Sequence, residues 1–390
     1  MNTLFFYCTL ATQAVLLSTA FAQSSAETTA AADNTPPLSA WLKKQGINAG
    51  GGLAVGGAHV FEHPAPGNNT PITFDDQNGA VQLNQFNLFL EHVVDRQAQA
   101  WHIGWRVDSL FGTDSRYTQA SGLDNKLIDH QDLGRYNLAI PQAYIEISTP
   151  FAHGMTAKVG HFYTLIGYEV VTAPNNFFYS HAYTMQYGEP FTHSGVLFSY
   201  VANRNVTINS GAVTGWDNFD QDAGVWNFLG NIAWLNDATD RSISFSVISG
   251  DVNQQLPCNR SLSSLVYSQG ITDKLQYVFQ QDFGYQQQTP TLNHPVFWYG
   301  VNQYLFYNLS EQIATGIRAE WFRDNNGVRL GSGVAADYVA LTYGINLKPF
   351  SWLSFRPELR YDYSDAAIKA YANHTKNQQL EIAVDMIATF

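Results

Sequence analysis

The sequence is poor in cysteine and in charged residues. It has only two cysteines in 390 residues, Cys8 and Cys258. Because Cys8 falls in the signal peptide predicted below, Cys258 is left alone, which excludes an intramolecular disulfide and a cysteine-rich metal site. Charged residues make up only 13% of the chain, and the net charge is −12. Since there is no basic stripe to neutralise phosphates, we expect no nucleic-acid partner.

Long apolar runs are also missing. Leu10–Phe21 is a short apolar stretch, and Ala20-Phe21-Ala22 has the small-x-small pattern of a signal-peptide cleavage site. The run is shorter than the ~20 residues that a spanning helix needs, and no later stretch supplies one. Membrane insertion would therefore require a closed barrel. We expect a signal peptide at 1–22, a disordered or short periplasmic leader at 23–46, and a transmembrane β-barrel at 47–390.

The usual catalytic and metal-binding motifs are absent as well. The chain has no HExxH, GxSxG, Walker or CxxC motif, and its eleven histidines are scattered. Two Ser–His neighbours, Ser180-His181 and His193-Ser194, do not create nucleophile–base geometry by adjacency alone. We therefore expect no metal, no cofactor and no enzyme activity. One alternative stays open, a hydrolase that assembles Ser or Asp with His from separate strands of an outer-membrane barrel.

Aromatic residues and strict alternation are abundant instead. Phe, Trp and Tyr make up 14% of the chain. Apolar and polar side chains alternate through Trp101–Phe111, Trp352–Tyr363 and Leu380–Phe390. A period of two over such lengths predicts strands with two different faces. A soluble sandwich turns the apolar face inward and a membrane barrel turns it outward to lipid, and alternation alone does not distinguish these two cases.

The number of segments and the lengths between them favour the barrel. Connections after even-numbered segments are short and those after odd-numbered segments are mostly longer, which is the asymmetry of an outer-membrane barrel with short periplasmic turns and long extracellular loops. An even strand count also suits such barrels and places both termini on the short-turn side. We predict an all-β, antiparallel transmembrane barrel of about sixteen strands near residues 47–60, 80–93, 100–111, 139–149, 155–166, 194–203, 205–214, 226–236, 241–250, 261–269, 273–286, 295–308, 312–323, 335–348, 352–364 and 378–390.

Charged residues of both signs occupy the polar faces of these strands. In one predicted hairpin Glu146 falls opposite Lys158, which predicts a cross-strand ion pair. Paired charges suit a water-filled interior better than a dry core. The alternative is a plugged barrel in which the pairs only hold interior packing. The residues predicted to line the pore are Arg106, Asp108, Glu146, Lys158, Arg318, Glu320, Arg356, Glu358, Arg360 and Asp362.

The predicted loops carry a surplus of acidic residues. This surplus favours a preference for cations, because rings of negative charge in a pore attract them. The alternative is a solvated acidic exterior without a role in selectivity. The acidic residues concerned are Asp75, Asp76, Asp114, Asp124, Asp129, Asp132, Glu169 and Glu189.

The stretch Gly167–Gly195 is long, rich in aromatic residues and without alternation. A segment of this length without regular structure points to a functional loop, and Gly and Pro residues near its ends would form its turns. We expect Gly167–His193 to follow the fifth strand, fold inward and narrow the pore. Its aromatic residues either form a sugar-binding platform or, as we favour, pack the loop onto the barrel wall. The predicted constriction residues are Glu169, Phe177, Phe178, Tyr179, His181, Tyr183, Tyr187 and Glu189.

Three stretches carry a resemblance to a known family. They are residues 104–108 (GWRVD) with 112–114 (GTD), residues 160–169 (GHFYTLIGYE) and residues 173–195 (APNNFFYSHAYTMQYGEPFTHSG). The first is similar to a GxRVDxLYGTD signature, with Phe111 where Tyr is common. These stretches resemble the OmpL-like β-barrel porins (β-barrel porin-2) of Gram-negative outer membranes, over roughly Trp41 to Phe390. The terminal Phe390 also looks like the assembly signal of outer-membrane barrels.

Together these features predict an outer-membrane porin, a diffusion channel for small hydrophilic solutes or ions. The expected partners are outer-membrane lipid and the solute, and a homo-oligomer stays open. The alternatives are the barrel-embedded hydrolase and a closed structural or adhesive barrel. The sequence does not specify the solute, the preferred ion, the oligomeric state, gating or a role for Cys258.

Overall fold

The computed structural model describes residues 37–65, 67–96, 100–126, 134–151, 154–219, 225–254 and 257–390, without the side chains of residues 37–40. The predicted signal peptide at 1–22 and most of the leader lie outside these residues, so the domain boundaries remain a prediction. Within the leader, α2 (Pro37–Lys44) is helical and precedes the first strand. Its N-terminal Pro and its C-terminal lysines suit the two ends of a helix.

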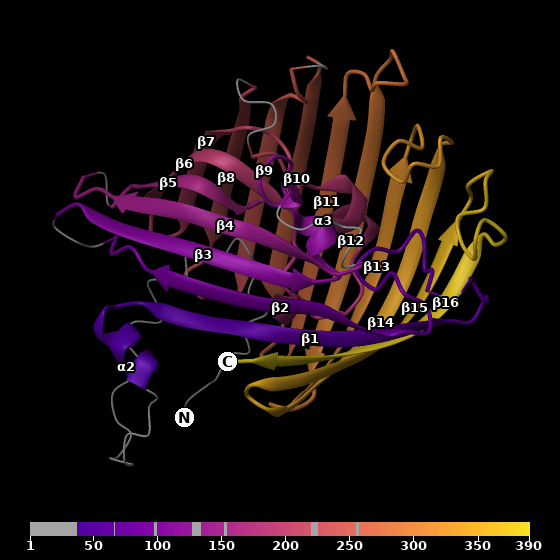
Figure 1. Ribbon diagram of the computed structural model, residues 1–390, viewed down its shortest axis with the longest axis horizontal. Helices are drawn as coiled ribbons and strands as arrows, with labels where there is room; N and C mark the ends of the chain where they lie inside the picture. The colour runs from indigo at the N-terminus through magenta and orange to yellow at the C-terminus, as the bar shows by residue number, and fades with distance from the viewer. Residues whose placement is uncertain are drawn as a thin grey trace.

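Sixteen antiparallel strands form a closed barrel, as predicted (Figure 1). The first and last strands close it, with register from Gly52 opposite Thr389 to Val60 opposite Glu381. The strands are β1 Asn48–Val60, β2 Val81–His92, β3 His102–Gly112, β4 Asn137–Ser148, β5 Thr156–Tyr163, β6 Thr192–Asn203, β7 Val206–Val213, β8 Asn227–Leu235, β9 Arg241–Asp251, β10 Asn259–Gly270, β11 Leu275–Gln286, β12 Val296–Asn308, β13 Ile313–Asp324, β14 Ala336–Phe350, β15 Leu353–Ser364 and β16 Gln378–Thr389.

The two faces of each strand decide between a sandwich and a membrane barrel. In β15, Leu359 and Tyr361 point outward with 45% and 41% of their surface exposed, whereas the alternating Arg360 is fully buried. In β16, Ile382 is 50% exposed and Glu381 is buried. The apolar face is therefore outside and the charged face inside, which is the reverse of a soluble protein and the arrangement of a barrel surrounded by lipid.

The connections differ in length at the two ends of the barrel, as expected. At one end most of them are shorter than at the other, and exposed aromatic residues such as Trp101, Phe151 and Trp352 flank them, in keeping with an interfacial girdle. The C-terminus lies at this end. The short turns are 93–101, 149–155, 204–205, 236–240, 271–274, 309–312 and 351–352, and the loops at the other end are 61–80, 113–136, 164–191, 214–226, 252–258, 287–295, 325–335 and 365–377.

The remaining helices among the described residues are short and lie in the long loops. They are α3 (Ser115–Thr118), η2 (Asp124–Lys126), η3 (Ala173–Asn175) and the π-helical turn η4 (Thr184–Gly188). Among the described residues, no helix has both the length and the apolar character to cross a membrane.

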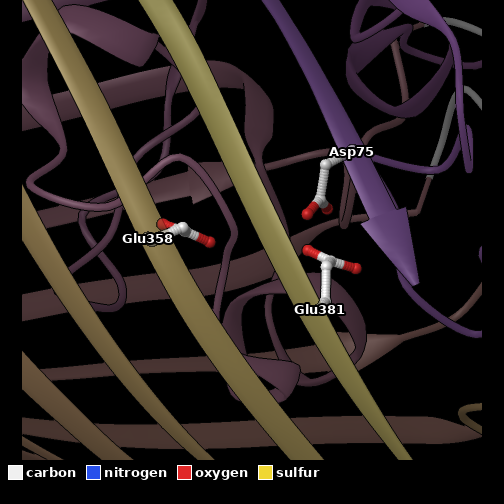
Figure 2. Close-up of side chains that lie close together, drawn as sticks. All are labelled: Asp75, Glu358 and Glu381. Carbon is white, nitrogen blue, oxygen red and sulfur yellow. The ribbon is translucent and has the colours of Figure 1, made fainter. Parts of the chain in front are cut away.

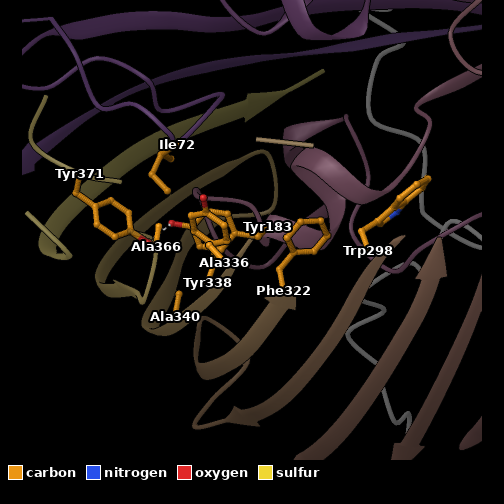
Figure 3. Packing of buried hydrophobic residues seen from close by; sticks show 9 residues of the cluster. All are labelled: Ile72, Tyr183, Trp298, Phe322, Ala336, Tyr338, Ala340, Ala366 and Tyr371. Atoms are coloured by element: carbon orange, nitrogen blue, oxygen red, sulfur yellow. Dashed lines mark hydrogen bonds between the residues drawn. The ribbon is translucent and has the colours of Figure 1, made fainter. Parts of the chain in front are cut away.

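The apolar core lies inside the barrel, between the wall and the loop that follows β5. Figure 3 shows Tyr183 of this loop among Phe322, Tyr338 and Tyr371 from the wall and the other loops. The Tyr183 and Tyr371 hydroxyl groups are hydrogen-bonded at 3.0 Å. The interior of this part of the barrel is therefore filled by protein and not by water alone.

Candidate functional site

The loop between β5 and β6, residues 164–191, crosses the interior of the barrel, and we call it the inner segment. Its backbone reaches three different parts of the wall. The Ala173 N–H donates to Gln85 Oε1 of β2 (3.0 Å), and the Tyr168 N–H donates to Gln280 Oε1 of β11 (3.1 Å). The Tyr179 N–H donates to a Glu358 oxygen of β15 (2.8 Å). The segment thus folds inward, and it is the sixteen-stranded wall that holds it.

Arginines of the wall bind the carbonyl groups of the inner segment. Arg318 of β13 donates to the Ser180 oxygen (2.7 Å), and Arg360 of β15 donates to the His181 oxygen (2.9 Å). Arg356 donates to two further carbonyls of the segment, at 3.0 and 2.8 Å. Buried irregular backbone needs partners for its polar groups, and here side chains supply what a neighbouring strand supplies elsewhere.

Glutamates of the same strands bind the N–H groups of the inner segment. Glu358 accepts from Tyr179 and Ser180, and Glu320 accepts from Tyr183 (2.7 Å). The arginines and glutamates also pair with one another and with aspartates, as in the Arg356–Asp385 pair (2.5 Å). The charged ladder of β13 and β15 therefore forms a clamp on the backbone of the inner segment.

Glycines on the inner face of the wall make room for the inner segment. A Cβ added at Gly300 would lie 2.3 Å from the Thr184 hydroxyl, and one at Gly344 would lie 2.9 Å from the Phe178 ring. A Cβ at Gly56 would lie 2.6 Å from the Tyr179 ring. These distances are too short for real contacts, so only glycine fits where the segment approaches this closely.

Two glutamates of the inner segment have opposite protonation behaviour. Burial alone would raise the pKa of Glu169, but Arg318 at 2.9 Å and the hydrogen bond from His181 outweigh it and hold the pKa at about 2. Burial, followed by the charge of Asp282, raises the pKa of Glu189 well above its usual range. The surroundings therefore favour the carboxylate form of Glu169 and the protonated form of Glu189.

A cavity of about 430 Å³ lies between the inner segment and the parts of β2–β5 nearer the short-turn end of the barrel. Glu169 and Glu189 line it from the segment, and Arg106, Glu146 and Lys158 line it from the wall. Charges of both signs therefore face one another across this space. It is large enough for ordered water and small polar solutes.

The pore-lining residues predicted from the sequence fall into two groups. Arg106, Glu146 and Lys158 line the cavity, and Asp108 is buried behind it in contact with Arg106 (2.7 Å). The other six are at most 4% exposed and lie against the inner segment, so that a role in lining a pore stays a prediction. These six are Arg318, Glu320, Arg356, Glu358, Arg360 and Asp362.

The predicted register of one hairpin is confirmed, but not its ion pair. Glu146 lies opposite Lys158 in the β4–β5 ladder. The Glu146 carboxylate nevertheless bonds Arg96 (2.9 Å), from the neighbouring turn, and the Lys158 ammonium lies 4.2 Å from the centre of the Tyr144 ring. Pairing β4 with β5 alone could not predict this contact, because Arg96 comes from the turn 93–101 between β2 and β3.

The aromatic residues of the inner segment pack against the wall. Phe177 lies 4.7 Å from Phe306, and Tyr183 lies 5.5 Å from Tyr338, measured between ring centres. Tyr187 donates a hydrogen bond to the Pro71 carbonyl of the β1–β2 loop. Packing onto the wall, which we favoured, thus accounts for these rings. The predicted constriction residues that pack on the wall or on the loop 61–80 are Phe177, Phe178, Tyr179, His181, Tyr183 and Tyr187.

The idea of a solvated acidic exterior is wrong for most of the loop acids. Their side chains turn inward, where backbone N–H groups, amides or arginines contact several of them, as Asp124 does with the Ile140 N–H (2.6 Å). Asp129 and Asp132 lie outside the described residues. The acids that are buried are Asp75, Asp114, Asp124, Glu169 and Glu189.

Comparison with known proteins assigns the family. Residues 46–390 match the family model described as "Putative beta-barrel porin-2, OmpL-like". The chain belongs to this family. No curated protein sequence matches it.

Solved porin structures share the fold of this family member at low sequence identity. The anion-selective porin from Comamonas acidovorans has a TM-score of 0.60 at 10% identity, covering 88% of this chain and 99% of that one. Pseudomonas putida OprB has a TM-score of 0.58 at 12% identity, covering 91% and 96%. The trimer form of Vibrio cholerae OmpT has a TM-score of 0.54 at 11% identity, covering 88% and 99%.

One Ser–His contact bears on the hydrolase alternative. His161 of β5 lies 2.8 Å from the Ser194 hydroxyl of β6. Its Nε2 atom has no hydrogen-bond partner among the described residues, and both side chains are buried. A nucleophile–base pair needs a third group to orient the imidazole and access for substrate. Among the described residues neither is found around His161, and so this contact does not make a catalytic pair.

Several functional residues escaped the sequence reasoning. The amides Gln85 and Gln280 bind the inner segment, and Arg96 pairs with Glu146. A signal was present in β2, where amides at positions 82, 84, 85 and 87 stand out in a strand with an apolar outer face. Amides that bind backbone groups are expected where a loop packs onto a strand.

Proposed function

We propose that this protein is an outer-membrane channel through which small hydrophilic solutes or ions diffuse. The 430 Å³ cavity carries the proposal, because charged groups of both signs line it inside a barrel whose outer face is apolar. Such a lining hydrates polar solutes, whereas lipid excludes them. Membership in the porin family agrees with this role.

In this proposal the inner segment narrows the path and solutes pass between it and β2–β5. Glu169 and Glu189 face Arg106 and Lys158 there. The clamp holds the segment against β13 and β15. The open space therefore lies on the side of β2–β5. Selectivity would then depend on the few charged groups at this gap.

Single-channel recording in planar bilayers tests the proposal. We expect conductance steps from the purified protein, and a reversal potential under a salt gradient will report the preferred ion. Absence of steps above background would refute the channel. Replacement of residues 175–182 by a short Gly/Ser linker should raise the conductance, because it removes much of the buried backbone from the interior. Unchanged conductance would mean that the segment does not limit the path.

A second candidate is a closed structural or adhesive barrel. It is favoured by the six charged residues that lie beneath the inner segment, since they fill part of the interior and do not face water. The same recording separates the two candidates, because a closed barrel passes no current.

Location and assembly follow from the same proposal. The apolar outer face requires outer-membrane lipid, and a signal peptide at 1–22 would direct export. A homo-oligomer is in keeping with the trimer form in which one structural neighbour is described. Membrane fractionation and native mass spectrometry in detergent test both points. Recovery in a soluble periplasmic fraction would contradict the location.

A further inference from the structure

Three buried carboxylates meet at the long-loop half of the barrel, outside the cavity described above. Asp75 comes from the β1–β2 loop, Glu358 from β15 and Glu381 from β16, and all are at most 4% exposed. One oxygen from each lies within 4.8 Å of the others. Figure 2 shows the Asp75 carboxylate pointing from its loop towards Glu381, with Glu358 beside them.

The oxygens at the centre of this group have unused bonding capacity. Neither oxygen of Asp75, nor Oε1 of Glu381, accepts a hydrogen bond from an N–H or hydroxyl group of another described residue. The Asp75 and Glu381 carboxyl groups are close enough to share a hydrogen bond with each other when one of them carries a proton. The other Glu381 oxygen accepts from Asn69, and the Glu358 oxygens accept the two N–H groups of the inner segment. An unpartnered carboxylate that is 99% buried is costly unless a cation or a proton joins it.

The surrounding charges do not neutralise this group. The arginines of the clamp are already bound to other acids, as Arg356 is to Asp385 (2.5 Å) and Arg360 to Asp362 (2.8 Å). The carboxylates of this network therefore outnumber its guanidinium groups. The network consists of Arg318, Arg356 and Arg360 with Asp75, Glu169, Glu320, Glu358, Asp362, Glu381 and Asp385.

We propose that Asp75, Glu358 and Glu381 bind one divalent cation of the Ca²⁺ type. Ca²⁺ takes oxygen ligands at about 2.3–2.6 Å, so that oxygens bound to one ion lie up to about 5 Å apart. The observed limit of 4.8 Å fits this span. Mg²⁺ binds at about 2.0–2.1 Å and requires a tighter group.

The ion would fasten three parts of the molecule together. Asp75 belongs to the loop 61–80, Glu381 to the strand that closes the barrel, and Glu358 also holds the inner segment through Tyr179 and Ser180. Removal of the ion should therefore loosen the long-loop end of the barrel. The competing state is one in which the carboxyl groups keep protons and no metal binds.

Calcium titration of the full mature chain, folded in detergent without membrane lipid and stripped with EDTA, tests the site. We expect calorimetry to give about one Ca²⁺ per chain, and thermal unfolding to occur at a higher temperature in Ca²⁺ than in EDTA. Asp75→Asn and Glu381→Gln should each weaken binding at least about tenfold, because each removes one ligand charge. Asp76→Asn is the matched control, since that carboxylate pairs with Arg116 instead.

Two outcomes would overturn the site. One is a wild-type protein that binds no Ca²⁺ and unfolds at the same temperature in EDTA, which indicates that protons occupy the cluster. The other is unchanged affinity in both neutral variants, which places the ion elsewhere. If these variants fail to fold, Glu381→Asp keeps the charge and should still weaken Ca²⁺ binding. Tyrosine-sensitised Tb³⁺ emission of the wild type, and its loss when Ca²⁺ displaces Tb³⁺, then tests whether the site binds a cation.

Discussion

The charged side chains of the inner face bind backbone as much as they bind one another. Arg318 donates to the Ser180 carbonyl and also contacts Glu169 and Glu320. An arginine has five N–H donors in a fixed fork, which lets one side chain hold a carbonyl and two carboxylates together. Such an arginine therefore neutralises buried carboxylates and also holds the inner segment in place.

Glu169 gives the anchoring of the inner segment a distinct dependence on pH. Its pKa of about 2 is below the ordinary 4.5, so its stabilising contribution is complete above pH 4.5 and is lost as pH falls through 2. We expect the free energy of unfolding to fall by up to about 1.4 kcal/mol per pH unit in this window from this group. Glu169→Gln should remove that part of the decline.

Chemical unfolding in detergent between pH 5 and pH 2 measures the effect. Glu189→Gln is the matched control, because burial raises the pKa of Glu189, so that its contribution to stability is not lost as pH falls. Both variants carry the same Glu→Gln substitution in the inner segment and differ only in its position. An equal pH dependence in wild type and Glu169→Gln would contradict the role assigned to the Arg318–Glu169 pair.

The inner segment is an irregular element, and its fit depends on small residues in regular ones. Gly300 of β12 and Gly344 of β14 lie where Thr184 and Phe178 meet the wall. Both strands pair with neighbours on each side, so the wall cannot move aside. A larger side chain must therefore displace the segment or strain it.

Gly300→Ala tests this fit with a single added methyl group. We expect it to lower the free energy of unfolding by about 1–3 kcal/mol, the usual cost of overpacking, and to increase channel conductance or its fluctuations. Gly270→Ala is the control, since a Cβ there meets nothing closer than 3.6 Å. Equal stability and equal conductance of the two variants would show that the segment is not seated against β12.

The barrel as a whole has its apolar surface outside and its charged surface inside. This arrangement is unstable in water, because apolar strands would expose large surfaces. In lipid the same strands are favourable, and closure leaves no unpaired edge. The charged interior is tolerated since the inner segment, the amides and the paired charges satisfy most polar groups.

Ile382→Arg tests whether lipid covers the outer face. Ile382 lies near the middle of β16 with 50% of its surface exposed. Arginine on a lipid-facing strand near the midplane costs about 2–4 kcal/mol. Ile368→Arg is the control, because Ile368 is 48% exposed but belongs to the loop 365–377, where the cost should be within about 0.5 kcal/mol.

Unfolding of both variants in lipid vesicles by guanidinium measures the difference. Similar small effects at the two positions would indicate that water, and not lipid, surrounds β16. A large effect at Ile382 alone would place the strand inside the membrane.

The sequence by itself determined the strands, their number, the long and short connections and the place of the loop after β5. These features are local, because each strand of an up-and-down barrel pairs with its neighbour in the chain, and the side-chain period of two follows from the backbone. The boundary of β5 was the least accurate, since the apolar Leu165 and Ile166 continue the pattern after the chain has turned inward.

Only the tertiary structure decided what the charged residues touch. Arg96 reaches Glu146, Arg356 reaches the Ala173 carbonyl, and Asp75 meets Glu381 from the other end of the chain. Such contacts depend on how an irregular segment and a loop fold across the barrel, and no local period encodes that path. The sequence therefore determined which side chains point inward, and the fold of the inner segment determined their partners.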